Sequence, residues 1–218
     1  MGKVMVGWLD DGECQGAFAE SMLNMVTVGA ANGVIAGWRR LEIGPVLSLG
    51  RNLMAESFLK TDNEWLLTVD SDMRFKHDLL DQLLAVADPA THPIVAPVCY
   101  TIKDDQVATV IYGMVDSMFC RLSGEQDQEV VRVDGVGFGC VLIHRTVFDR
   151  IAANHKMPGK WFDPMYLKGE PLGEDLAFCM RARAAGIPIH AHTTIPIDHL
   201  RGHLAINREM YLATRKEK

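Results

Sequence analysis

Three short segments of the sequence carry side chains whose types and spacing could do chemistry. The first is Asp70-Ser71-Asp72, which directly follows the apolar run Trp65–Val69. Two carboxylates that leave the end of a buried strand can both face a cleft beyond it. Mg²⁺ and Mn²⁺ prefer oxygen ligands and often bridge carboxylates to substrate phosphates. The same tripeptide could instead only end the strand, because aspartates also form turns.

The second segment holds two adjacent acids, Glu174 and Asp175, at the start of a predicted helix. Acids in the first helical turn stabilise the helix by ~0.3–1 kcal/mol, which could be their whole purpose. A carboxylate presented at a helix start, directly after a Gly-rich loop, can also act as a general base. The residues alone leave both interpretations open.

The third segment is Asp198–His203, which contains His199 and His203. Neutral imidazole is a good ligand for Mn²⁺ and other transition metals. The chain has eight histidines, however, so a histidine at the surface is the simpler interpretation of this segment.

The elements that must position these residues alternate between strands and helices in the first half of the chain. Apolar runs predict strands over residues 3–8, 34–43, 65–69 and 94–98. Helical patterns lie between them, over residues 17–30, from Ser48 to Leu59 and around Leu79–Leu84. This order predicts an α/β fold with a Rossmann-like, mainly parallel central sheet.

The second half predicts a smaller antiparallel portion. Short strands are expected over residues 107–112, 115–122, 129–133 and 138–144, followed by a helix from Thr146 to Ala153. A loop at 158–173, a helix at 174–185 and an extended segment at 187–197 complete the pattern. Since no linker separates the halves, we expect one domain, residues 1–218, with functional halves of about 1–100 and about 101–218.

Composition restricts the class of protein and its compartment. A net charge of −6 and a pI of about 5.7 argue against a general nucleic-acid-binding protein. The five cysteines are odd in number and form no C-x-x-C pair, which excludes a disulfide framework and indicates a reducing compartment. The N-terminus lacks the apolar core of a signal peptide, and the uncharged stretch 21–38 predicts a buried helix and a strand, with no membrane span. We therefore expect a cytoplasmic protein.

Several nucleotide-binding classes lack their motifs here. A dinucleotide-binding enzyme needs G-x-G-x-x-G between the first strand and the first helix, where this chain has GWLDDGECQG. The Gly-rich segment 135–139 runs into a strand and not a helix. No Walker-type G-K-[ST] is present, and the acidic Asp10-Asp11 argues against a sugar-nucleotidyl transferase.

Taken in order, the segments resemble the GT-A glycosyltransferases of the family-2 type, in particular small bacterial and phage-type members. The matching segments, which include the DXD motif, are LSLGRNLMAESFL, WLLTVDSDMRF, DGVGFGCVLIHRTVF, KWFDP and LGEDLAFCMRARAAGIPIHAHTTIPIDHL. They cover roughly residues 45–203. The resemblance implies a single GT-A domain whose first half binds a nucleotide sugar, in the cytoplasm of a bacterial cell or a phage-infected host.

The resemblance also implies roles for the three segments. Asp72 would hold a divalent cation, Mn²⁺ or Mg²⁺, on the diphosphate of the donor, and Asp70 would assist it or contact the ribose. His199 would complete the metal site. Asp175 would be the catalytic base, with Glu174 beside it.

Further positions are implied around the donor and the acceptor. Arg51 and Ser71 would line the nucleotide-sugar pocket. The loop that would edge the nucleotide base consists of Trp8, Leu9, Asp10 and Asp11. The acceptor would lie against Trp161 and Phe162, because aromatic faces suit sugar rings, although ordinary core packing explains these two aromatics equally well.

The implied activity is that of a metal-dependent hexosyltransferase that moves a sugar from a nucleotide-diphosphate donor to an acceptor hydroxyl, with inversion. The acceptor could be a glycan, a protein, a small molecule or a modified base in nucleic acid, and the oligomeric state is open. The alternative is a non-catalytic nucleotide- or carbohydrate-binding module that retains the fold. Metal-dependent turnover of the donor would distinguish the two.

Overall fold

The computed structural model describes residues 3–156 and 158–216. Its first half alternates strands and helices, as the apolar runs predicted. The elements are β1 (Val4–Asp10), α1 (Gly16–Ala31), β2 (Ile35–Glu42), α2 (Leu47–Leu59), β3 (Trp65–Val69), β4 (Met73–Phe75), α3 (Leu79–Val86) and β5 (Ile94–Pro97). The short strand β4, directly after Asp72, was not predicted.

The second half begins with the short strands β6 (Tyr100–Lys103), β7 (Gln106–Thr109), β8 (Ile111–Val115), β9 (Met118–Arg121), β10 (Val130–Val133) and β11 (Gly135–Val136). It continues with β12 (Cys140–His144), α4 (Arg145–His155), β13 (Met165–Leu167), β14 (Glu170–Leu172), α5 (Glu174–Ala184), β15 (Ile189–His192), β16 (Ile197–Arg201), β17 (Leu204–Ile206) and α6 (Arg208–Lys216).

The second half differs from its prediction in several places. Elements β6, β11, β17 and α6 were not predicted, and the strand expected at 115–122 is interrupted by the turn between β8 and β9. The strand expected at 107–112 is divided between β7 and β8, because Val110 lies between two different hairpins. The loop expected at 158–173 contains the hairpin β13–β14. The single extended segment expected at 187–197 ends with β15 at His192, and β16 is a separate strand of a different sheet.

The central sheet has seven strands in the order β10-β15-β5-β12-β3-β1-β2. Pairs β1–β2, β1–β3 and β5–β15 are parallel, while β12 and β10 run antiparallel to their neighbours. The predicted α/β class with a mainly parallel sheet is therefore confirmed. Smaller antiparallel sheets, built mostly from the second half, account for the predicted antiparallel portion.

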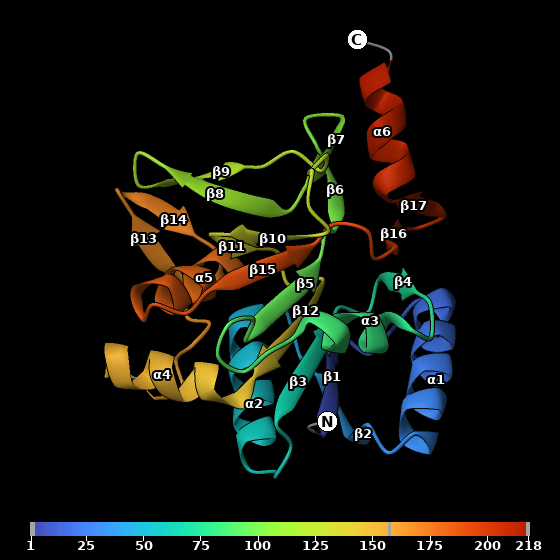
Figure 1. The fold of residues 1–218 in the computed structure, drawn as a ribbon, viewed down its shortest axis with the longest axis vertical. Coiled ribbons are helices and arrows are strands. Elements are labelled where there is room, and N and C mark those ends of the chain that lie inside the picture. Colours follow the sequence, from blue (N-terminus) through green and yellow to red (C-terminus); the bar gives the residue numbers. More distant parts are fainter. Residues whose placement is uncertain (1–2, 157, 217–218) are drawn as a thin grey trace.

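Helices cover both faces of the central sheet (Figure 1). On one face α1 and α3 enclose a core that includes Phe18 and Leu83, and on the other α2, α4 and α5 enclose a core that includes Phe58 and Phe148. All five residues of β3 are buried, as expected for a strand covered on both sides. The rigid packing of these layers fixes where the strand ends lie.

Gly50 lets α2 lie directly against the ends of β1 and β2. A Cβ at this position would overlap the side chain of Ile43 and press on Leu9 at 3.1 Å. The close approach places the next residue, Arg51, beneath the carboxyl end of the sheet, where β1, β2 and β3 all end. Parallel strands deliver their following loops to one edge, so the sequence-predicted residues gather there.

The uncharged stretch and the cysteines agree with what their sequence predicted. The uncharged stretch 21–38 forms part of α1 and the start of β2. Among the residues that the structure describes, no helix is long and apolar enough to cross a membrane. All five cysteines are free thiols, of which Cys14 and Cys120 are exposed.

Candidate active site

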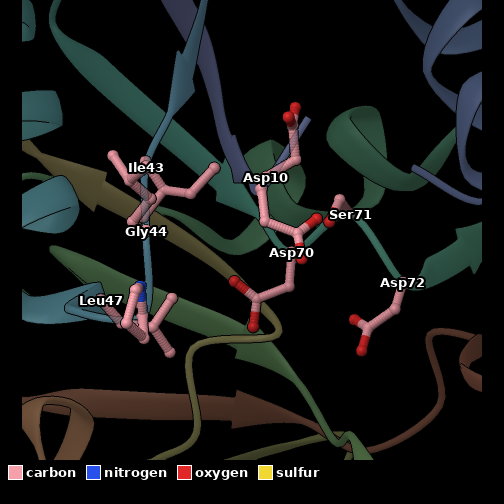
Figure 2. Close-up of a pocket in the computed structure, with 10 residues that line it drawn as sticks. Asp10, Ile43, Gly44, Leu47, Asp70, Ser71 and Asp72 are labelled. Carbon is pink, nitrogen blue, oxygen red and sulfur yellow. The ribbon is translucent and has the colours of Figure 1, made fainter. Parts of the chain in front are cut away.

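A cavity of about 480 Å³ lies at the carboxyl ends of β1, β2 and β3. Three loops line it, and their lining residues are Leu9, Asp10, Asp11, Ile43, Gly44, Pro45, Leu47, Asp70, Ser71 and Asp72. Figure 2 shows Ile43, Gly44 and Leu47 on one side and the aspartates with Ser71 on the other. The cavity is therefore apolar on one wall and acidic on the other.

The Asp72 carboxylate lies beside the imidazole of His199, with Oδ2 and Nε2 3.0 Å apart. These residues are far apart in sequence, and they meet because β16 pairs antiparallel with β4, the strand that follows Asp72. The Leu200 amide also donates to the Asp72 carbonyl at 2.7 Å, which fixes the turn against β16. The hydrogen bond to Asp72 raises the pKa of His199.

The second ring nitrogen of His199 is held by the backbone. Its Nδ1 lies 3.1 Å from the carbonyl oxygen of Tyr100, which can only accept, so Nδ1 carries a proton. The Asp72 carboxylate also only accepts, so Nε2 carries a proton in its hydrogen bond to Asp72, and a cation bound between the two side chains would replace that proton. A backbone acceptor on the far nitrogen is the usual way in which a metal-ligating histidine is oriented.

The pair fits a divalent cation that is shared with a bound phosphate. No group of three or more His, Cys, Asp or Glu side chains within 3–156 and 158–216 is arranged to hold a metal by itself. One carboxylate and one imidazole supply two ligands, and Mg²⁺-type sites commonly complete their coordination with substrate phosphates and water. The donor set of Asp72 and His199 thus suits an ion whose remaining ligands are phosphate oxygens and water.

Next to this pair lies a cluster of three acids around one buried cation, which we call the Arg51 cluster: Arg51, Asp70, Glu174 and Asp175. The Arg51 guanidinium is 3.3 Å from Asp70, 3.5 Å from Asp175 and 3.8 Å from Glu174. Its side chain is only 4% exposed, and it also lies over the Phe138 ring. Helix α2 provides the cation, Asp70 directly follows β3, and α5 begins with the other two acids.

Two carboxyl groups of the Arg51 cluster have perturbed pKa values. Burial raises the pKa of Asp70 to about 6, although Arg51 acts in the opposite direction. Burial and the adjacent Glu174 raise the pKa of Asp175, against the effects of Arg51 and of the Phe138 amide. A single guanidinium does not neutralise three acids, so the cluster carries excess negative charge.

The two oxygens of Asp175 have different surroundings. Oδ2 accepts a hydrogen bond from the Phe138 amide at 3.0 Å, whereas the buried Oδ1 has no hydrogen-bond partner among the described residues. The amide holds the carboxylate in one orientation. Oδ1 faces the Arg51 guanidinium at 3.5 Å, while the Asp175 side chain as a whole is 30% exposed.

Asp10 is occupied by an ion pair inside the protein. Its two oxygens accept from Nε and Nη2 of Arg40 at 2.7 and 2.6 Å, and this bond lowers the pKa of Asp10. The interaction ties the end of β1 to β2 and stiffens that side of the cavity. Asp10 therefore lines the cavity mainly as part of its framework, while Asp11 is exposed beside it.

Two predictions about aromatic residues need correction. Trp8 does not line this cavity: its ring stacks on Trp38 and faces α1, because side chains alternate along β1. Trp161 and Phe162 are 5% and 3% exposed and belong to the core, so they present no face to an acceptor. The Trp161 ring nitrogen donates to the Phe148 carbonyl, which completes its burial.

Sequence reasoning missed the apolar wall of the cavity, Ile43 to Leu47. The signal was present, since Gly44-Pro45 ends a predicted strand that is parallel to β1 and so ends at the same edge. It also missed Tyr100 and Phe138, whose backbone groups orient His199 and Asp175. Backbone donors and acceptors leave no residue-type signature, so no pattern could have identified these two.

Comparisons with known proteins bear on the fold. No family model matches the sequence, and no curated protein matches it. Among solved structures, A197 from STIV is similar with a TM-score of 0.59 and 16% identity, over 95% of this chain and 91% of that one. GalNAc-T7, whose crystal structure holds UDP, GalNAc and Mn²⁺, is similar with a TM-score of 0.61 and 12% identity. That match covers 92% of this chain but 43% of GalNAc-T7.

These likenesses show the fold. The chain has a GT-A-like α/β fold, as the resemblance of its segments to glycosyltransferases predicted. At identities of 12% and 16% they do not show a family.

Proposed function

We propose that this protein is a metal-dependent glycosyltransferase that moves a sugar from a nucleotide-diphosphate donor to an acceptor hydroxyl with inversion. The observation that carries the proposal is the convergence of two separate acidic groups beside one cavity. The Asp72–His199 pair can hold a cation on a diphosphate, and the Arg51 cluster presents a base next to it. The GT-A-like fold supports the same activity.

Asp175 is the proposed base. Its carboxylate, which the Phe138 amide holds in one orientation and which is 30% exposed, would accept the proton of the acceptor hydroxyl as the acceptor oxygen attacks the anomeric carbon of the donor. The bond between that carbon and the diphosphate breaks at the same time, and its electron pair leaves with the diphosphate. A pKa raised by burial makes Asp175 a stronger base than an exposed aspartate.

The remaining residues position the donor. A divalent cation bound with the donor would neutralise charge that develops on the departing diphosphate. Asp72 and His199 would hold that cation, with His199 oriented by the Tyr100 carbonyl. Arg51 keeps Asp70 at the cavity floor, and the wall of Ile43 to Leu47 offers an apolar surface to the nucleotide.

The proposal includes the broader expectations from the sequence. The first half of the chain would bind the donor and the second half would supply the base, within a single domain and in a reducing cytoplasm. Mn²⁺ or Mg²⁺ would be the cofactor. The acceptor class is left to the assay.

Donor turnover is the direct test. The protein would be incubated with a panel of nucleotide-diphosphate sugars, with Mn²⁺, with Mg²⁺ or with EDTA, and release of the nucleoside diphosphate would be measured. We expect slow, metal-dependent hydrolysis of at least one donor even without an acceptor. Binding without turnover of any donor would identify the alternative, a non-catalytic binding module. A donor at one hundred times its Kd should also stabilise the protein by about 2.7 kcal/mol.

A further inference from the structure

Strand β2 forms a free edge of the central sheet. It is the last strand in the order, and among the described residues it pairs only with β1. The Ile43 amide donates to the Asp10 carbonyl at 2.8 Å, so its backbone groups point toward β1. Backbone direction alternates along a strand, and the other odd-numbered residues of β2 therefore also point toward β1. By the same alternation, the backbone N–H and C=O groups of Trp38, Arg40 and Glu42 point away from the sheet.

Exposed apolar side chains flank this edge on both faces. On the α1 face Trp38 is 61% and Leu23 69% exposed, and between them lies an almost wholly apolar hollow of about 400 Å³. On the α2 face the exposed apolar side chains are Val46, Leu47, Leu49 and Leu53. Exposed apolar side chains grouped around a free strand edge are typical of a protein–protein contact.

We propose that a second copy of this chain pairs antiparallel with β2 about a two-fold axis and extends the sheet across two protomers. Charged residues normally protect an exposed edge from pairing. Here the charges are of both signs, and the edge is complementary to itself. With Leu41 opposite Leu41 of the second copy, each Arg40 lies opposite a Glu42, and this happens twice because of the symmetry.

Other registers with the correct backbone alternation are less favourable. Pairing centred on Arg39 or on Arg40 places an arginine directly opposite itself, and like charges in that position destabilise a strand pair. If the pairing were shifted by one residue, residues whose N–H and C=O groups point outward would lie opposite residues whose groups point back toward β1, and the hydrogen bonds could not form. In the Arg40–Glu42 register each Arg40, which Asp10 and Glu42 of its own chain already contact, faces a further carboxylate across the two-fold axis.

This register connects the interface to the cavity. Trp38 of one protomer comes opposite Gly44 of the other, at the start of the loop that forms the apolar wall. Pairing would therefore support that wall from outside. The proposal does not depend on the proposed enzymatic activity, since it rests only on the edge, its charges and its apolar neighbours.

Oligomeric state gives the first test. The mass in solution would be measured by light scattering and sedimentation over a wide concentration range for the wild type, Trp38→Asp and Val115→Asp. Val115 is a matched control, because it is 56% exposed but lies at the tip of the β8–β9 hairpin. We expect a dimer for the wild type and Val115→Asp, and a monomer for Trp38→Asp with unchanged circular dichroism. A monomeric wild type, or a dimer that persists in Trp38→Asp, would overturn the proposal.

Cross-linking tests the register, in a background of Cys14→Ser and Cys120→Ser that removes the exposed thiols. Leu41 and its symmetry mate form a non-hydrogen-bonded pair, whose Cα separation of about 4.5 Å suits a disulfide. Leu41→Cys should therefore give a covalent dimer on mild oxidation by a soluble disulfide. Arg39→Cys should not, because it lies four residues from its mate along the strand. Cross-linking of Arg39→Cys but not of Leu41→Cys would contradict this register.

Discussion

The Asp72–His199 pair and the Arg51 cluster lie at the same edge of the sheet but are constructed in opposite ways. The pair is open to solvent, with Asp72 43% and His199 22% exposed, and one short hydrogen bond joins its members. The cluster is organised around a guanidinium that is 4% exposed, with three ion-pair distances of 3.3 to 3.8 Å and no short contact.

The difference shows how one edge can combine two kinds of polar chemistry. In the open pair a ligand can replace the bond between Asp72 and His199, since solvent already reaches both groups. In the Arg51 cluster the acids are partly desolvated, so their protons are held more tightly and their charges interact strongly. An exposed pair suits reversible binding, whereas a partly buried acid suits proton transfer.

The largest effect should come from the proposed base. Asp175→Asn keeps the size of the side chain but removes its affinity for a proton, and we expect turnover to fall by roughly 10²–10⁴ while donor binding stays near wild type. Steady-state kinetics with a competent acceptor, together with donor calorimetry, would measure both. Glu174→Gln is the matched control and should be milder, because adjacent helical residues point about 100° apart and only one can face the acceptor. Full activity in Asp175→Asn would exclude this role.

Stability should distinguish the cluster from the pair. Arg51→Met leaves three acids around an apolar side chain, and removal of one partner from a buried charge network costs about 3–5 kcal/mol. Urea unfolding would measure the loss, with Arg51→Lys as a control that retains the charge and should lose less. If Arg51→Met unfolds at the wild-type urea concentration, the cation does not hold the cluster together.

The open pair should instead affect metal-dependent binding. Asp72→Asn and His199→Gln should each weaken the metal-dependent binding of a nucleoside diphosphate by at least roughly 10–100-fold, the usual cost of losing even an indirect metal partner. Calorimetric titrations with Mn²⁺ and with EDTA would separate this part of the affinity. His203→Gln, at an exposed histidine near the same strand, should bind like the wild type. Unchanged metal-dependent affinity in Asp72→Asn would refute the assignment.

The smallest effect concerns the stability of the protein at low pH and involves His190 on β15, near the opposite edge of the central sheet. Burial, with His92 and Arg132 nearby, lowers the pKa of His190 to about 4. The unfolded chain then binds a proton near pH 6.5 that the folded chain does not, so this histidine makes the protein less stable as pH falls from 7 toward 4. Allowing for partial solvent screening, we expect a loss of about 1 kcal/mol between pH 7 and pH 5.

His190→Gln should remove that part of the pH dependence, as measured by urea unfolding at a series of pH values. The variant also serves the comparison, because it removes the contribution of one histidine from a pH dependence to which the acids of the Arg51 cluster contribute. An unchanged slope in His190→Gln would show that His190 has the same pKa in the folded and the unfolded chain.

The alternation of apolar runs with helical patterns along the sequence was enough to predict the fold class. Runs such as Trp65–Val69 are too apolar for anything but a strand covered on both faces, and their order along the chain implies parallel pairing. The second half was less predictable. The boundary between short strands with mixed patterns, such as β7 and β8, depends on the hairpin to which each residue belongs. That in turn depends on pairing partners elsewhere in the chain.

Residue types and order also indicated the polar residues of the candidate site, since Asp70, Asp72 and Asp175 stand at element boundaries where a fold of this class presents side chains. Aromatic residues were misplaced for a related reason. The residue types of Trp161 and Phe162 are the same whether they face a cleft or a core. Only the packing of Trp161 against Phe148, and of Phe162 against Phe138 and Phe178, decides between the two.

By itself, then, the sequence determined which elements form and which acids leave their ends, because those properties depend on local apolar spacing and residue type. The resemblance to glycosyltransferases had already implied that His199 joins Asp72. The tertiary structure alone decided that one buried Arg51 serves three acids, and that the Tyr100 carbonyl and the Phe138 amide orient two side chains. Each of these contacts joins segments from different strands or helices. Their geometry is fixed by sheet order and by the close approach of α2 at Gly50, which no local pattern encodes.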